Sequence, residues 1–147
     1  MEAIKTLVTA FIGSFGFALL YGLRKRYILP ASLGGLISWA AYLLFDYIFS
    51  DKQMFLSCLF ATMITAIYVN ILAYRIKAPT TLFLLPAILP LIPGSDLYYM
   101  FLYFYRSDYG NMKHYAVNLV TFMFAIAIGM SVIWSLKYIK KGIFVKE

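Results

Sequence analysis

Five apolar stretches, separated by charged residues, set the main limit on how this chain can fold. Each is about 18 to 22 residues long, the length that spans about 30 Å of hydrocarbon as an α-helix. The composition agrees, because 63% of the residues are hydrophobic and only 13% are charged, unlike a typical soluble domain. The sequence therefore predicts an all-α integral membrane protein, a five-helix transmembrane bundle forming a single domain over residues 1–147. The predicted spans are 3–23, 28–49, 54–74, 80–103 and 115–136.

The first apolar stretch could be mistaken for a secretory signal. Its positive region is weak, with Glu2 beside Lys5, and no small-x-small cleavage site follows the apolar run. The basic cluster Arg24-Lys25-Arg26 comes after the stretch instead, where it would stop the helix on the cytoplasmic side. We therefore expect the first span to be retained.

The basic residues of alternate loops predict the orientation of the bundle, because five spans put the two termini on opposite sides. One side carries the larger group, Arg24, Lys25, Arg26, Arg75, Lys77, Lys137, Lys140, Lys141 and Lys146; the other carries Lys5, Lys52, Arg106 and Lys113. The N-terminus is thus predicted outside and the C-terminus in the cytoplasm. Attraction of these basic residues to anionic lipid also accounts for the net charge of +7, so we expect no nucleic-acid partner.

The fourth span contains a break, in the segment LLPAILPLIPGSD at 84–96. Pro86, Pro90 and Pro93 cannot donate to a helical ladder, and each destabilises a helix interior by roughly 3 kcal/mol. Irregular backbone at membrane depth persists only where protein or a water-filled cavity surrounds it. The fourth helix is therefore predicted to be broken by proline and glycine near the membrane midplane, beside a transport pathway.

The break also predicts the chemistry of a binding site. We expect Pro93 and Gly94 to end one half-helix, and the next half-helix to present free N–H groups with partial positive charge. The carbonyls of Leu82 and Pro86, four residues before prolines, would present partial negative charge. A zwitterion suits this arrangement, which is expected of discontinuous helices in secondary transporters. The alternative is a kinked structural helix whose backbone is satisfied internally.

Asp96 is the leading candidate for a functional side chain. Counted from the outer helix ends, Asp96, Thr121 and Thr62 fall in one layer near the midplane, where an ionisable group indicates a functional site. The alternative is that Asp96 only caps the helical segment 97–105. The predicted substrate-binding residues are Pro90, Pro93, Gly94, Ser95, Asp96, Asn118 and Thr121.

Small residues at four-residue spacing permit close helix packing in lipid. One such stripe in the first span is formed by Ala10, Ser14, Ala18 and Gly22, and one in the fifth by Asn118, Thr121, Ala125 and Gly129. Each stripe is explained by ordinary packing. The fifth also carries hydrogen-bonding side chains, which is why it contributes candidates to the site.

Enzyme chemistry has little support in the sequence. There is no nucleotide-binding loop, no Ser/His/Asp order and no metal-ligand spacing. Cys58 is the sole cysteine and lies within a span, and His114 begins the fifth span at the outer surface, where we expect it to be interfacial. The sequence thus predicts no catalytic residues, no metal site and no cofactor.

Several motifs resemble the threonine/serine exporter family, specifically its smaller, C-terminal-type membrane module. They read RIKAPTT at 75–81 and LPLIPGS at 89–95, with FGF at 15–17 and LGGLISW at 33–39 in the first two helices. The resemblance covers nearly the whole chain. It implies a multi-pass protein of the bacterial cytoplasmic membrane that exports small hydroxy amino acids, with relatives proposed to export dicarboxylates such as succinate. It also implies a partner, a second five-helix subunit of the same family.

The leading hypothesis is therefore a membrane subunit of a secondary exporter of small polar metabolites, with threonine and serine first. A succinate-type dicarboxylate exporter subunit and a non-transporting scaffold or assembly subunit are the alternatives, and a membrane-embedded enzyme is a more remote one. In an inverted pair, this N-outside module would complement an N-inside partner across the lipid bilayer.

Overall fold

The computed structural model describes residues 2–49 and 53–144, and within these ranges the chain forms helices and short connections without strands. The predicted all-α class is confirmed for this part of the chain. In chain order the helices are α1 (Glu2–Leu20), α2 (Lys25–Phe49), α3 (Met54–Ile76), α4 (Thr80–Ile88), the short 3₁₀ helix η1 (Leu89–Leu91), α5 (Gly94–Tyr105) and α6 (Tyr109–Phe144).

Residues with left-handed torsion angles follow three of the helices: Gly22 after α1, Lys77 after α3, and Ser107, with φ 57°, after α5. Gly22 has a φ of +70° just beyond α1, a conformation that glycine adopts without strain. Lys77 has φ 53° and ψ 46° at the end of α3, and the N–H of Ala78 donates to the carbonyl of Ala73 at 3.1 Å. Gly22 therefore ends α1 rather than continuing its stripe of small packing residues, and a Cβ there would touch nothing within 4 Å.

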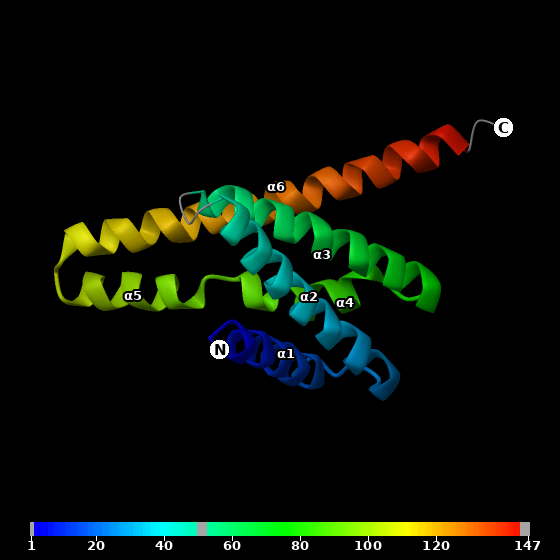
Figure 1. Cartoon of the computed structure of the whole chain (residues 1–147), viewed down its shortest axis with the longest axis horizontal. Helices are drawn as coiled ribbons and strands as arrows, with labels where there is room; N and C mark the ends of the chain where they lie inside the picture. The colour runs from blue at the N-terminus through cyan, green and yellow to red at the C-terminus, as the bar shows by residue number, and fades with distance from the viewer. Residues whose placement is uncertain (1, 50–52, 145–147) are drawn as a thin grey trace.

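Helix α2 is the centre of the bundle. It packs against α1, α3 and α4, whereas α6 packs along α3 and then against α5. Figure 1 shows that α5 and the first part of α6 run side by side and extend beyond the other helices. No residue of α5 is buried, so this hairpin of α5 and α6 has a large uncovered surface.

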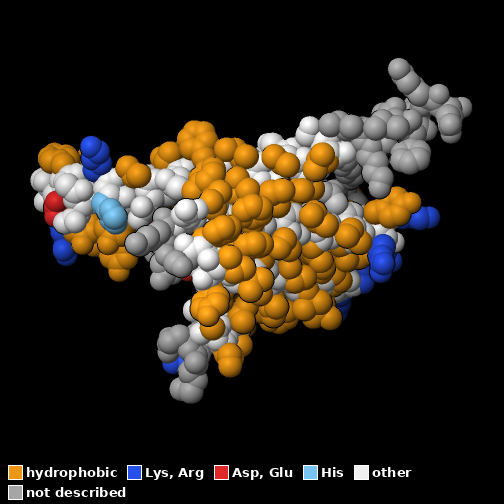
Figure 2. Space-filling view, turned by 45° about the horizontal axis from the view of Figure 1, so that its top comes forward, with side chains coloured by type: hydrophobic (Ala, Val, Ile, Leu, Met, Phe, Trp, Pro, Cys, Tyr) orange, Lys and Arg blue, Asp and Glu red, His pale blue; other side chains and the backbone are white. Residues whose placement is uncertain are grey.

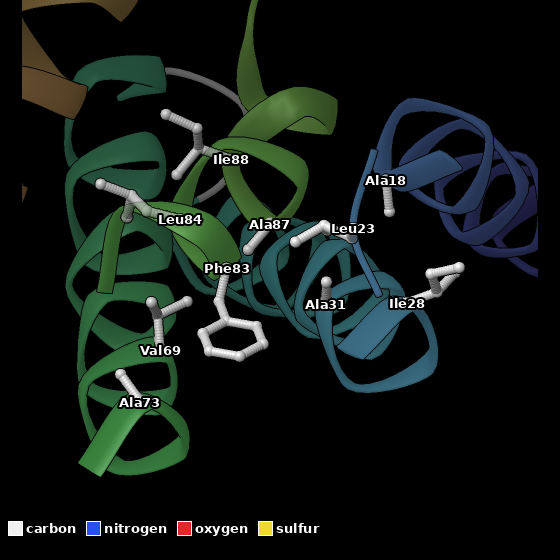
Figure 3. Close-up of a cluster of buried hydrophobic side chains, with 10 residues drawn as sticks. All are labelled: Ala18, Leu23, Ile28, Ala31, Val69, Ala73, Phe83, Leu84, Ala87 and Ile88. Atoms are coloured by element: carbon white, nitrogen blue, oxygen red, sulfur yellow. The ribbon is translucent and has the colours of Figure 1, made fainter. Parts of the chain in front are cut away.

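The main hydrophobic cluster lies where α2, α3 and α4 meet the end of α1 (Figure 3). Phe83 is fully buried at its centre and meets the ring of Tyr27 edge-on at 5.6 Å. Most of its neighbours are aliphatic. The buried members are Ala18, Leu23, Ile28, Ala31, Val69, Ala73, Phe83, Leu84, Ala87 and Ile88.

Glycines allow the closest helix approaches. A Cβ added to Gly34 would lie 2.7 Å from the Cβ of Ala87, and one added to Gly129 would lie 2.9 Å from the carbonyl oxygen of Leu59. Real Cβ atoms do not tolerate such contacts. Gly34 thus brings α4 onto α2, and Gly129 brings α3 onto α6, as expected for helices that associate in lipid.

The surface is apolar over most of its area. Figure 2 shows hydrophobic side chains across the middle of one face, with lysine and arginine side chains toward its ends. By length and composition α1, α2, α3 and α6 are each able to cross a membrane, and the pair Thr80–Leu91 and Gly94–Tyr105 makes a fifth span if it crosses once. The fold is that of a multi-pass membrane protein.

Candidate functional site

The segment from Pro86 to Gly94 prevents α4 and α5 from forming one continuous helix. Pro86 lies inside α4, η1 tightens the chain after Ile88, and Ile92 is extended with φ −71° and ψ 120°. The two helical parts are bent by 57° at this break. Because three prolines remove backbone donors, a continuous helix would leave several of its carbonyls unpaired here.

The start of α5 differs in detail from the sequence prediction. Pro93 and Gly94 do not end the first half-helix, which is complete at Leu91. Pro93 instead occupies the N-cap position of α5, and Gly94 is the first residue of that helix. A proline suits this place because an N–H is not needed where a helix begins.

Asp96 is not the N-cap that the sequence allowed. It lies in the first turn of α5, and no side chain caps that helix. A carboxylate in this position is favoured by the positive end of the helix dipole. The capping role is therefore wrong, and Asp96 keeps its carboxylate oxygens available for other contacts near the break.

Backbone donors and acceptors face the break from opposite sides. The first helical bond of α5 runs from the N–H of Leu97 to the carbonyl of Pro93 at 3.2 Å, so the N–H groups of Ser95 and Asp96 precede the ladder. On the α4 side, the carbonyls of Leu82 and Pro86 have prolines four residues later, which have no N–H to donate. Further along, the carbonyl of Leu89 accepts a hydrogen bond from the N–H of Ile92 at 3.2 Å.

Stacked tyrosines fix how α5 lies along α6. The ring of Tyr115 is 5.2 Å from that of Tyr99 and 5.5 Å from that of Tyr103. These helices are antiparallel, so one turn nearer the break Asp96 and Asn118 fall at the same level. The hairpin thus places these two candidates at a similar level on neighbouring helices.

His114 of α6 lies close enough to Asp96 to interact with it electrostatically. The sequence placed His114 only at the outer surface and did not connect it with the site. The relation depends on the register of the hairpin, which is set by packing of the tyrosines rather than by residue spacing. No simple sequence signal would have revealed it.

Thr121 and Thr62 do not share a layer, contrary to expectation. The hydroxyl of Thr121 donates to the carbonyl of its own helix at Val117, at 2.8 Å. Thr62 is fully buried where α3 crosses α6 at Gly129, about 12 Å further along α6 than Thr121 at about 1.5 Å per residue. The layer is absent because α3 crosses α6 at a different height from α5.

The predicted substrate-binding residues differ in exposure. Pro93 is buried; Pro90, Asp96, Asn118 and Thr121 are half-buried; Gly94 and Ser95 are exposed. All of these candidates except Pro93 are thus at least partly accessible.

Sequence reasoning did not anticipate the contact between Ser14 of α1 and Gly35 of α2. Ser14 appeared only in a stripe of small packing residues, whereas its hydroxyl occupies the place that a Cβ on Gly35 would take, a point 3.4 Å from the carbonyl oxygen of Pro86. Within the described ranges no group of three or more His, Cys, Asp or Glu residues could hold a metal ion. The available chemistry is hydrogen bonding to a small polar molecule.

Comparison with known proteins agrees with the resemblance noted above. A family model described as "Threonine/Serine exporter, ThrE" matches residues 6–136. No match was found to a curated protein or to a solved structure. Because the family model covers most of the chain, the protein belongs to the threonine/serine exporter family, a family of transporters.

Proposed function

We propose that this member of the threonine/serine exporter family is a membrane subunit of a secondary exporter of small polar metabolites, with threonine and serine as its first substrates. The observation that carries the proposal is the interruption at Pro86–Gly94 in a pair of helices otherwise apolar enough to cross a membrane. Such irregular backbone is tolerated beside a polar pathway.

The groups around the break complement an amino acid. The leading N–H groups of α5 would bind a carboxylate, as helix N-termini do. The carbonyls of Leu82 and Pro86, each with two lone pairs, would accept from an ammonium group, and the carboxylate of Asp96, in the first turn of α5, would attract the same positive charge. A dicarboxylate such as succinate would bring two negative charges to Asp96 and no ammonium group for the carbonyls, which favours the zwitterionic amino acid over this alternative.

The need for a partner follows from the α5–α6 hairpin. No residue of α5 is buried, yet this helix carries Asp96, and an ionisable group facing lipid would be strongly disfavoured if α5 lies within the membrane. Alternating access also usually involves two bundles that move against each other around a central site. We therefore assign the hairpin as the face covered by a second five-helix subunit of the family, arranged as an inverted pair in the bacterial cytoplasmic membrane.

The test is efflux of labelled threonine, serine and succinate from cells that express this chain with a second five-helix protein of the family, compared with either chain alone. The proposal predicts efflux only with both chains, and a loss of at least about tenfold for Asp96→Asn if its charge contributes a hydrogen-bonded contact. Asp108→Asn, in the loop before α6, is the matched control and should export normally. Efflux that does not depend on this chain would favour a scaffold instead.

A further inference from the structure

One buried hydroxyl differs from all the other buried serines and threonines that the structure describes. Ser32, Ser38, Ser57, Thr62 and Thr65 each donate to a backbone carbonyl three or four residues earlier in the chain, at 2.7 to 3.4 Å. Ser14 is fully buried, and its Oγ has no hydrogen-bond partner. A buried hydroxyl in this condition destabilises a protein by about 1–3 kcal/mol, so its presence requires an explanation.

The Ser14 hydroxyl is directed across the helix crossing rather than back along α1. A Cβ on Gly35 would collide with the Ser14 Oγ and would lie 3.4 Å from the carbonyl oxygen of Pro86. The Ser14 side chain therefore fills the space that residue 35 leaves by having no side chain, and the Pro86 carbonyl borders the same space. The helical donor for the Pro86 carbonyl would be residue 90, a proline without an N–H.

A second unpartnered donor borders the same segment. Trp39 Nε1 is the other buried side-chain atom without a hydrogen-bond partner in the described ranges. Trp39 follows Gly35 by one turn on the same face of α2. It packs against the hydrophobic cluster that contains Leu91 of η1. Both orphan donors thus lie on elements that contact the interrupted helix.

We infer that Ser14 Oγ, Trp39 Nε1 and the carbonyl of Pro86 form the subsite that takes the hydroxyl group of the substrate. The inference rests on the proposed export function and names the part of the site that would select hydroxy amino acids. A hydroxyl has one donor and two acceptor lone pairs, which match two protein donors and one protein acceptor. A methyl group matches none of them, and a carboxylate would face the Pro86 carbonyl unfavourably.

The packing of α1 determines when this subsite is accessible. Helix α1 lies directly on Gly35 in this structure, so the substrate hydroxyl enters when α1 separates from α2 and α4. The unpaired hydroxyl weakens that closed contact, because burying it without a partner is unfavourable. In the open form, a hydrogen bond between the Ser14 hydroxyl and the substrate replaces the partner that is missing in the closed form.

The experiment compares efflux of serine with efflux of alanine, which lacks only the hydroxyl. In the two-chain exporter, Ser14→Ala should lower the preference for serine about tenfold, the effect of about one hydrogen bond, without lowering the thermal unfolding temperature. Trp39→Phe keeps the ring that stacks on Tyr42 and should shift the preference in the same direction. Ser32→Ala is the control, because Ser32 is buried but bonded to its own helix.

The outcomes separate this inference from the proposed function. An unchanged preference in Ser14→Ala, or an equal loss of serine and alanine efflux, overturns the hydroxyl subsite and leaves the exporter standing. Export of succinate, but not of serine or threonine, by the wild-type pair would also overturn the hydroxyl subsite while leaving an exporter. If the wild-type pair exports none of these compounds, both the exporter and its subsite are wrong.

Discussion

Individual glycines decide how closely the helices approach. At Gly129 an added Cβ would lie 2.9 Å from the carbonyl oxygen of Leu59 and 3.1 Å from the Cβ of Thr62. The first contact is to backbone, which cannot move away without shifting α3. At Gly13, by contrast, an added Cβ would meet nothing within 4 Å, so these two glycines form a matched pair for mutation.

We expect Gly129→Ala to destabilise the protein by about 1–3 kcal/mol, the usual effect of overpacking. Gly13→Ala should be neutral or stabilising by roughly 0.5–1 kcal/mol, because alanine favours a helix interior. Thermal unfolding in detergent measures both. Equal unfolding temperatures for the two variants would show that the α3–α6 crossing is looser than described.

Asp108 caps α6. Its Oδ1 accepts the N–H of Asn111 at 3.2 Å, and its Oδ2 accepts from the Asn111 amide at 2.7 Å. These bonds lower the pKa of Asp108 below its ordinary value of 3.8, and the bond from the Asn111 side chain has the larger effect. Because the folded pKa is depressed, the stabilisation is complete above pH 3.8 and is lost as the pH falls through the folded pKa.

Asp108→Ala should therefore lower the unfolding temperature at neutral pH, with the difference from wild type shrinking in acid. Asp108→Asn keeps an N-cap acceptor but does not titrate, so its stability should change less than that of wild type over the same acid range. Unfolding scans at pH values from neutral to below 3.8 make the comparison. If the difference in unfolding temperature between wild type and Asp108→Ala stays constant with pH, the ionised Asp108 does not stabilise the start of α6.

Among the elements, the α5–α6 hairpin depends on aromatic packing more than on burial. Tyr115 stacks on both Tyr99 and Tyr103, and each aromatic pair contributes about 0.5–1.5 kcal/mol beyond its buried area. We expect Tyr115→Ala to increase hydrogen exchange in α5 by at least about tenfold while α3 stays protected. Tyr109→Ala, at an exposed position of the same helix, is the control. Unaltered exchange in α5 would mean that the tyrosines do not hold the hairpin.

The helices themselves were largely predictable, because apolar stretches of membrane-spanning length leave few other folds. Helix α6 begins at Tyr109, before the predicted start at 115, because hydropathy detects apolar content and not the polar first turns of a helix. The prolines predicted a broken fourth span; the structure has a 57° bend between two helical parts, and the first part ends at Leu91. Pro93 can start a helix as readily as end one.

The sequence suggests candidate site residues only where their chemistry lies in consecutive positions. Candidates within residues 90–96 were proposed because the prolines and glycine are close in sequence, and their role stays a prediction. Ser14 was not proposed, because its position against Gly35 and near Pro86 depends on how α1 crosses α2. The link between His114 and Asp96 likewise depends on hairpin register. Contacts between elements distant in sequence require the three-dimensional arrangement.

At the scale of the whole molecule, the proposed topology predicts a cytoplasmic C-terminus and an external N-terminus. A green fluorescent protein fused to the C-terminus should fluoresce, and alkaline phosphatase fused there should be inactive. Fusions at the N-terminus, with an added export segment, should behave in the opposite way. A cytoplasmic N-terminus would contradict the inverted pairing with an N-inside partner.

If the interrupted helix carries transport, restoring a backbone N–H at the break should impair export, and two prolines provide the test. Pro90→Ala restores such an N–H within η1, whereas Pro30→Ala makes the same change inside α2, away from the break. In the two-chain efflux assay with labelled serine and threonine, Pro90→Ala should reduce export at least about tenfold without loss of stability. Pro30→Ala should stay within about twofold of wild type. Equal export by the two variants would show that the break is a structural kink and not the substrate site.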